Sequence, residues 1–290
     1  MRIEVNGVRL YFDIQGAGLE PDGPAMREKP TLILLHGGPG MDHAAYKPEF
    51  YRLADLAQVV FLDHRGNGRS EDGPPERQTL AQWGDDVAAF CDALEIARPI
   101  VYGLSFGGFV AQSVATRHPE RLSGLILAST SSRTVHARKY RAFERLGGPA
   151  ARAAAEGFWG GAIDEAAIAA WQQHCVPHYN TAPRDAEADR RTILRAATMQ
   201  RFFAAGGERE RMDFLADLAR VAVPTLVLAG EDDPVATIED MEELRDHLPA
   251  SLVPYHAIAG AGHGTHRDRP AQTFALIRRF IEDVGSEAAG

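Results

Sequence analysis

The sequence predicts an α/β fold in which a doubly wound, mostly parallel sheet of eight strands carries an inserted helical segment. Short, continuous apolar runs alternate with segments of helical spacing along most of the chain. Such runs are typical of parallel strands that helices cover on both faces. One long stretch, residues 131–220, interrupts this alternation and contains helix-forming segments only. It indicates an insertion into the sheet domain.

Strands are expected wherever a short apolar run is bounded by turn residues. The first two form a hairpin, because Asn6-Gly7 is a strong two-residue turn signal between apolar segments. The Gly- and Pro-rich segment 16–30 is expected to be a mobile surface loop. Six further strands, buried in the sheet, are expected at residues 31–35, 59–62, 99–102, 125–128, 225–228 and 252–255.

Helices are expected between these strands. One runs over residues 80–94, where Thr79 and Gln82 are placed to form a capping box, and the last runs over 271–284, after Pro270. The insertion is expected to lie over the carboxyl edge of the sheet, where ligands bind in such folds. The predicted domains are therefore an α/β core of residues 1–130 and 221–290 and a helical cap of residues 131–220.

The composition excludes several classes of protein. A chain of 290 residues, 45% hydrophobic and 24% charged, can bury the core of one large domain. A net charge of −9 without a basic run argues against a nucleic-acid partner. Cys91 and Cys175 supply neither a disulfide framework nor a paired metal motif. No apolar stretch has the length of a signal core or a membrane span, so we expect a cytoplasmic protein without a membrane partner. The oligomeric state is left open.

The segment 103–107 predicts a nucleophile at a turn between a strand and a helix. Gly103 and Gly107 stand two residues before and two residues after Ser105. Small residues there let strand and helix approach each other, and the sharp turn strains the backbone of the serine. The hydroxyl is thereby presented at the carboxyl edge of the sheet, beside the positive end of a helix. We predict that Ser105 is a catalytic nucleophile.

A serine hydroxyl needs a base, and the base needs a carboxylate that orients it. His263 follows the last predicted strand, after a Gly-x-Gly bend. Asp233 lies three residues past Gly230, at the end of the preceding strand, and is the predicted orienting acid. Its neighbour Asp232 is the alternative. The order serine, acid, histidine is the one that a sheet of this kind uses.

A second group of glycines follows the strand at 31–35, in the loop 36–40. We predict that the backbone N–H groups of Gly38 and Phe106 form an oxyanion hole, in which each donor is worth about 2.7–4 kcal/mol. Gly37 is expected to contact the substrate. The loop lacks the Gly-Lys-Ser/Thr ending of a phosphate-binding loop, and no metal-ligand spacing is present, so neither a metal nor a cofactor is expected.

The segments 36–40 (HGGPG) and 63–70 (DHRGNGRS), together with the turn at Ser105, resemble the α/β-hydrolase superfamily, and within it the proline iminopeptidase-related branch. The resemblance covers nearly the whole chain. It implies cleavage of an N-terminal residue, often proline, with glutamates that hold the free ammonium. One such glutamate sometimes follows the catalytic acid, where this chain has Pro234. The candidates for a cap glutamate are Glu156, Glu165 and Glu187.

The predicted cap is also rich in large apolar side chains, which either pack the cap or face the cleft. Phe158, Trp159 and Trp171 are the expected substrate-binding residues; further members of the group are Tyr179, Met199, Phe202 and Phe203. An apolar wall of this kind suits an ester, a lactone or an aryl amide as well as a peptide.

The sequence therefore predicts a proline iminopeptidase-like serine hydrolase that cleaves a carboxylic ester or amide of a small molecule through an acyl-enzyme on Ser105. A carboxylesterase or lactonase without aminopeptidase activity is the alternative, as is a cofactor-free lyase or perhydrolase with the same triad. A dehalogenase or epoxide hydrolase is disfavoured, because these enzymes have an aspartate at the nucleophile position. A non-catalytic ligand receptor would be expected to lack part of the triad.

Overall fold

The computed structural model describes residues 1–160 and 163–288, and it contains the expected sheet. Eight strands lie in the order β1-β2-β6-β5-β7-β8-β9-β10. The first two pairings, β1 with β2 and β2 with β6, are antiparallel, and all others are parallel. The fold class predicted from the sequence is therefore confirmed. The strands are β1 (Arg2–Val5), β2 (Val8–Gln15), β5 (Thr31–Leu35), β6 (Gln58–Leu62), β7 (Ile100–Leu104), β8 (Gly124–Ala128), β9 (Thr225–Gly230) and β10 (Tyr255–Ile258).

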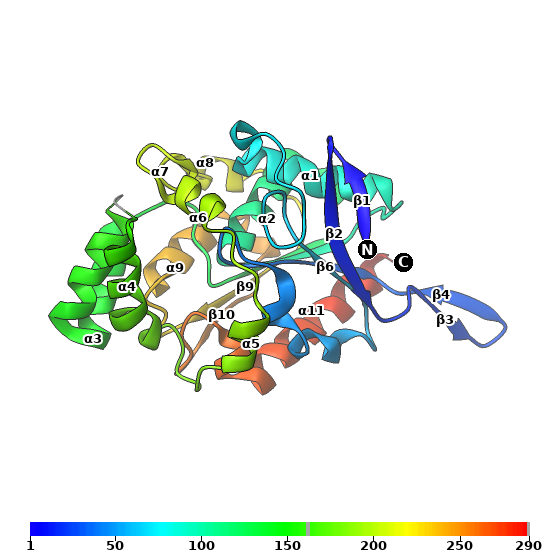
Figure 1. Ribbon diagram of the computed structural model, residues 1–290. Helices are drawn as coiled ribbons and strands as arrows, with labels where there is room; N and C mark the ends of the chain where they lie inside the picture. The colour runs from blue at the N-terminus through cyan, green and yellow to red at the C-terminus, as the bar shows by residue number, and fades with distance from the viewer. Residues whose placement is uncertain (161–162, 289–290) are drawn as a thin grey trace.

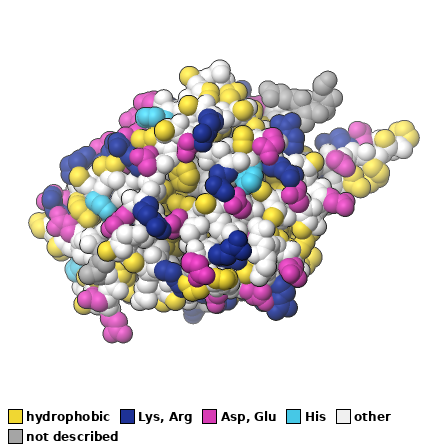
Figure 2. All heavy atoms as spheres, turned by 90° about the horizontal axis from the view of Figure 1, so that it is seen from above, with side chains coloured by type: hydrophobic (Ala, Val, Ile, Leu, Met, Phe, Trp, Pro, Cys, Tyr) yellow, Lys and Arg dark blue, Asp and Glu magenta, His cyan; other side chains and the backbone are white. Residues whose placement is uncertain are grey.

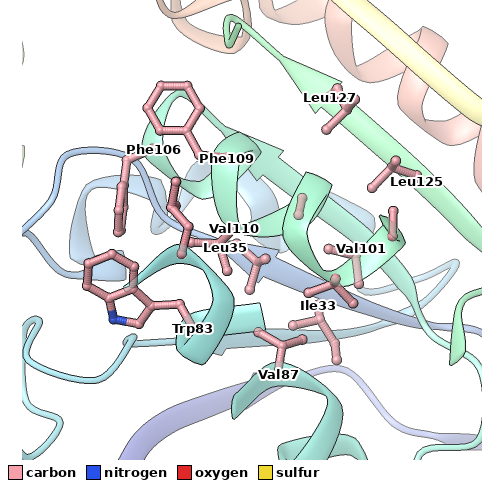
Figure 3. Packing of buried hydrophobic residues seen from close by; sticks show 14 of the residues in the cluster. Ile33, Leu35, Trp83, Val87, Val101, Phe106, Phe109, Val110, Leu125 and Leu127 are labelled. Atoms are coloured by element: carbon pink, nitrogen blue, oxygen red, sulfur yellow. The ribbon is translucent and has the colours of Figure 1, made fainter. Parts of the chain in front are cut away.

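Helices cover both faces of the sheet, and alternate residues of the central strands β5 to β9 enter different cores. In β5, for example, Ile33 and Leu35 pack with α1 (Leu80–Ala93), α2 (Phe106–Arg117) and α9 (Ile238–His247). Leu32 and Leu34 pack instead with α11 (Pro270–Ala288) and the short helix Glu49–Leu53. Figure 1 shows the sheet between these layers, and Figure 3 shows the packing on the α1–α2 face. The continuous apolar runs in the sequence reflect this two-sided burial.

The chain between β8 and β9 is helical, as expected. It contains α3 (His136–Trp159), α4 (Glu165–His174), α5 (Ala186–Arg191), α6 (Ala196–Phe203), α7 (Glu208–Arg211) and α8 (Leu215–Leu218). The helix α3 is broken at Gly148, which has a φ of 72° and is followed in the chain by Pro149. The two halves of α3 therefore run in different directions. A separate hydrophobic cluster holds α3 and α4 together, away from the sheet (Figure 1).

The segment 16–30 is not the loop that the sequence predicted. It forms a hairpin of β3 (Leu19–Asp22) and β4 (Ala25–Glu28), which projects from the molecule in Figures 1 and 2. The signal was the two-residue turn Gly23-Pro24 between the paired residues Asp22 and Ala25, in which Gly23 takes a φ of 58°. Acidic and basic side chains are interspersed over the face in Figure 2, which is consistent with the absence of a basic run in the sequence.

Two local expectations at helix and strand ends also need correction. The last strand begins at Tyr255 rather than residue 252, since Pro254 has no N–H to donate and contributes only its carbonyl, to Val227. Thr79 does accept a hydrogen bond from the Gln82 N–H (3.1 Å), but the Gln82 side chain bonds Asp86 instead of returning to the cap. Within the described residues, no helix is long and apolar enough to cross a membrane.

Candidate active site

Ser105 occupies the turn between β7 and α2, in a conformation that few residues other than glycine adopt. Its φ and ψ are 54° and −116°. Its N–H donates to the carbonyl of Ala128 at the end of β8 (3.1 Å), and its carbonyl accepts from the N–H of Gly108 (2.9 Å). These bonds hold the strained backbone in place. The side chain is half-buried at the start of α2.

The glycines around Ser105 are required because strand and helix cross closely here. A Cβ on Gly103 would overlap the carbonyl of Gly107, and a Cβ on Gly107 would overlap the carbonyl of Leu35. A Cβ on Gly108 would overlap the side chain of Thr130, whose hydroxyl donates to the Ser105 carbonyl (2.8 Å). The steric reason given for the small neighbours of the serine is therefore confirmed.

His263 and Asp233 are paired at the ends of β10 and β9. The imidazole Nδ1 of His263 lies 2.9 Å from Oδ2 and 3.1 Å from Oδ1 of Asp233. The carboxylate is buried and also accepts hydrogen bonds from the N–H groups of Val235 (2.7 Å) and Ala236 (3.0 Å). The alternative acid, Asp232, is only half-buried and lies 3.3 Å from Arg145. Of the two candidate acids, Asp233 is the one that contacts the imidazole.

The loop of His263 is held by a segment of the insertion, residues 179–182. The N–H of His263 donates to the carbonyl of Tyr179 (2.6 Å), and the two rings meet edge to face with centroids 5.5 Å apart. The N–H of Gly264 donates to the side chain of Asn180 (2.8 Å). A Cβ on Gly262 would overlap the carbonyl of Tyr179, so this close approach needs glycine.

Asp268, in α10 (Thr265–Asp268), joins that segment to the histidine loop. Its buried carboxylate accepts hydrogen bonds from three backbone N–H groups, those of Gly262 (2.7 Å), Thr181 (3.0 Å) and Ala182 (2.9 Å). Neither Asp268 nor the contact of residues 179–182 with the histidine loop was predicted from the sequence, in which Tyr179 stood out only as an aromatic residue of the cap. Their contacts join positions about eighty residues apart, for which the sequence carries no local signal.

The loop 36–40 runs beside Ser105. A Cβ on Gly37 would lie 3.3 Å from the Cβ of Ser105. The N–H of Gly37 already donates to the hydroxyl of Tyr46 (2.6 Å), whose pKa burial raises to about 12. Gly38 has a φ of 64°. Within the described residues, neither the Gly38 N–H nor the Phe106 N–H donates a hydrogen bond to another group of the chain.

The segment 63–70 supports this loop. The buried Asp63 carboxylate accepts from the backbone N–H groups of His43 (3.0 Å) and Arg69 (2.9 Å) and lies 2.7 Å from Nδ1 of His43. Burial acts to raise the pKa of Asp63, but its bonds with His43 outweigh this and lower it to about 2. Asn67 accepts a hydrogen bond from the N–H of Gly40 (2.5 Å). The segment therefore fixes the glycine loop.

The three aromatic residues expected to bind substrate pack within the insertion. Phe158 stacks on Trp171 with ring centroids 4.7 Å apart, and Trp159 packs on Phe143. Phe158 and Trp159 are buried. The Nε1 of Trp171 donates to the hydroxyl of Tyr179 (3.1 Å), which links the cluster to the residue that contacts His263.

The three glutamates suggested as ammonium ligands are exposed. Glu156 pairs with Arg152 (2.8 Å) one helical turn away, and Glu187 lies 3.6 Å from Arg191. Glu165 is in the first turn of α4 and is exposed. No cluster of three or more His, Cys, Asp or Glu side chains that could hold a metal ion occurs in the described part of the chain.

Comparisons with known proteins identify the fold family of the chain. The family model described as alpha/beta hydrolase fold matches residues 30–270. The chain is 26% identical over 298 residues to a proline iminopeptidase of Lactobacillus helveticus, covering 95% of each chain. It is 24% identical over 259 residues to 3-oxoadipate enol-lactonase 1 of Acinetobacter baylyi, covering 89% of this chain and 91% of that protein.

Two further similarities differ in extent. A putative carbamate hydrolase RutD of Caulobacter vibrioides is 36% identical over 124 residues, which is 43% of each chain, so the chain matches less than half of that relative's length. The crystal structure of a proline iminopeptidase of Mycobacterium smegmatis superposes with a TM-score of 0.78 at 24% identity, covering 99% of both chains. At that identity the likeness is one of fold.

Proposed function

This chain belongs to the alpha/beta hydrolase fold family, and on that premise we propose that it cleaves a carboxylic ester or amide of a small molecule through an acyl-enzyme on Ser105. The observation that carries the proposal is the 2.9 Å contact between Nδ1 of His263 and the buried Asp233. An imidazole oriented in this way keeps Nε2 free to take a proton from a nearby hydroxyl.

The proposed reaction has two halves. In the first, Nε2 of His263 takes the Ser105 proton as Oγ attacks the acyl carbon, and the Gly38 and Phe106 N–H groups hold the oxyanion. The tetrahedral intermediate then collapses and expels the leaving group, which takes the proton from Nε2 of His263. In the second half, Nε2 of His263 takes a proton from water as the water oxygen attacks the acyl carbon. The bond from the acyl carbon to Oγ then breaks, Nε2 returns its proton to Oγ, and the acid product leaves. Asp233 stays ionised and stabilises the imidazolium.

The domain organisation belongs to the same proposal. We propose that residues 131–220 form a cap on a core of residues 1–130 and 221–290. The hydrogen bonds from the histidine loop to Tyr179 and Asn180 support a cap that contributes to the site.

Whether the site can hold a positively charged substrate group narrows the substrate class. An aminopeptidase has to bind a free ammonium, and a buried cation needs an acidic partner. Glu156 and Glu187 are exposed and placed beside arginines, and the residue after Asp233 is Pro234. These facts favour an ester, a lactone or an amide without a terminal ammonium over the iminopeptidase activity named for two of the similar proteins.

The proposal is tested with Ser105→Ala and p-nitrophenyl acetate. We expect turnover to be lost, together with covalent labelling by a fluorophosphonate probe at residue 105. The matched control is Ser251→Ala, since Ser251 is exposed and lies in the short helix Ala250–Leu252. Hydrolysis by Ser105→Ala at the wild-type rate would refute the mechanism. A labelled serine with no turnover on any ester, lactone or amide would favour a lyase or perhydrolase.

The substrate class is tested separately, by comparing prolyl-p-nitroanilide with its N-acetylated form. We expect the free amine to give no advantage. A strong preference for the free amine would show ammonium recognition and restore the iminopeptidase assignment.

A further inference from the structure

Arg209, in α7, is a buried cation without a partner. The residue is 5% exposed. In the described part of the chain its guanidinium donates no hydrogen bond and has no carboxylate within 4.0 Å, and Nη1 is buried without an acceptor. Burial lowers the pKa of Arg209 to about 10, against the opposing influence of Asp240. A buried charge without a partner is destabilising, so its presence calls for an explanation.

The guanidinium lies beside the helix that begins at Ser105. Its central carbon is 5.0 Å from the centroid of the Phe109 ring, and the N–H of Phe109 donates to the Ser105 carbonyl (3.3 Å). Phe109 lies against Phe106 with centroids 6.4 Å apart (Figure 3). Residues four apart share one face of a helix, with a rise of about 6 Å between them. The guanidinium thus packs on a side chain in the first turn of the helix that follows the proposed nucleophile.

Two charged groups act on Arg209, the buried Lys139 and the buried Asp240. Lys139 is buried, donates to the carbonyl of Val235 (2.5 Å) and lies 3.6 Å from Asp240. Asp240 also accepts from Thr237 (3.1 Å) and Arg138 (2.9 Å), so its carboxylate is already engaged. The two acids beside Arg209 in α7 are engaged as well: Glu208 accepts a hydrogen bond from the N–H of Leu80 (2.7 Å), and Glu210 accepts one from the N–H of Gly206 (2.8 Å).

We propose that Arg209 binds a carboxylate at the far end of the acyl group of the substrate. The inference rests on the proposed function and narrows it to esters, lactones or amides of acids that carry a second carboxylate. The planar guanidinium can donate two parallel hydrogen bonds to a carboxylate, which would supply the acceptors that the protein does not. Its place over the Phe109 ring, in the helix that follows Ser105, adds cation–π packing that holds the guanidinium on this side of the site.

The kinetic test compares the p-nitrophenyl half-ester of glutaric acid with p-nitrophenyl butyrate. In Arg209→Met we expect the ratio of kcat/KM for the half-ester to that for the butyrate to fall by about 10- to 100-fold, as expected for the loss of hydrogen bonds to a charged group. Arg211→Met is the matched control, since Arg211 lies in the same helix but is exposed and paired with Glu208 (2.5 Å). Its ratio should equal that of the wild type.

A binding measurement separates this inference from the catalytic proposal. In Ser105→Ala, glutarate is expected to raise the melting temperature, and in Ser105→Ala/Arg209→Met it is not. Arg209→Lys, which keeps the charge, should retain part of the shift and covers the case in which the methionine variant misfolds. An unchanged kinetic ratio, or equal glutarate shifts with and without Arg209, would overturn the inference. If the wild type hydrolyses neither ester but glutarate still binds through Arg209, the catalytic proposal alone fails.

Discussion

Asp268 is expected to matter for both stability and catalysis, because its carboxylate fixes the backbone behind His263. In Asp268→Ala, the N–H groups of Gly262, Thr181 and Ala182 lose their acceptor. A hydrogen bond to a charged group contributes about 1.5–3 kcal/mol, and the two partly buried donors can regain water. Counting the buried Gly262 bond in full and the other two at half gives a loss of about 4 kcal/mol in the free energy of unfolding.

The catalytic effect follows from the displacement of the imidazole. A shift of about 1 Å in a catalytic group can cost on the order of 100-fold in rate, so we expect kcat to fall by about 10- to 100-fold while KM changes little. Denaturant unfolding gives the first quantity, and steady-state hydrolysis of p-nitrophenyl acetate gives the second. The control is Asp283→Ala, whose exposed carboxylate lies 3.8 Å from Arg279. The reasoning is refuted if Asp268→Ala unfolds within about 0.5 kcal/mol of the wild type or keeps its kcat.

Two further predictions concern the scaffold of the site. Gly107→Ala places a Cβ against the carbonyls of Leu35 and His36 and should destabilise the protein by about 3 kcal/mol or more. Gly157→Ala, in open space within α3, should instead stabilise it by about 0.5–1 kcal/mol. Thermal unfolding of both variants measures the two effects. The pKa of Asp63 is lowered to about 2 from 3.8, so the carboxylate stabilises the fold above pH 3.8 by about 2 kcal/mol, and this contribution is lost as the pH falls towards 2. Asp63→Asn should therefore be less stable than the wild type at pH 7 by about that amount, with a difference that narrows in acid; an equal difference at pH 7 and pH 3 would contradict the assignment.

The sequence was most informative where a local steric rule applies. The run before Ser105 and the glycines around it identify the strand, the turn and the helix, because few other residues fit so close a crossing. The pairing of His263 with Asp233 also followed from strand ends that meet at one edge of the sheet. The catalytic roles of these residues stay predictions until they are measured.

The expectations that failed, and the features that were missed, depend on information that the sequence does not carry locally. The hairpin β3–β4 was obscured by a composition rich in Gly and Pro, although Gly23 at the first position of its two-residue turn is itself a turn signal. The contacts of Asp268 join segments distant in the chain. Arg209 is one of many arginines in the sequence, and only the structure shows that it is buried without a partner.

The bonds from residues 179–182 to the histidine loop also bear on how a substrate reaches the serine. The N–H of His263 is hydrogen-bonded to the carbonyl of Tyr179. An outward movement of residues 179–182 would therefore draw the imidazole away from the Ser105 hydroxyl. If substrate entered by displacing residues 179–182, His263 would move out of position for proton transfer at the same time. Substrate could instead enter through a movement of α3 and α4 about the break at Gly148. Residues 179–182 would then stay in place, and His263 would keep its position during entry.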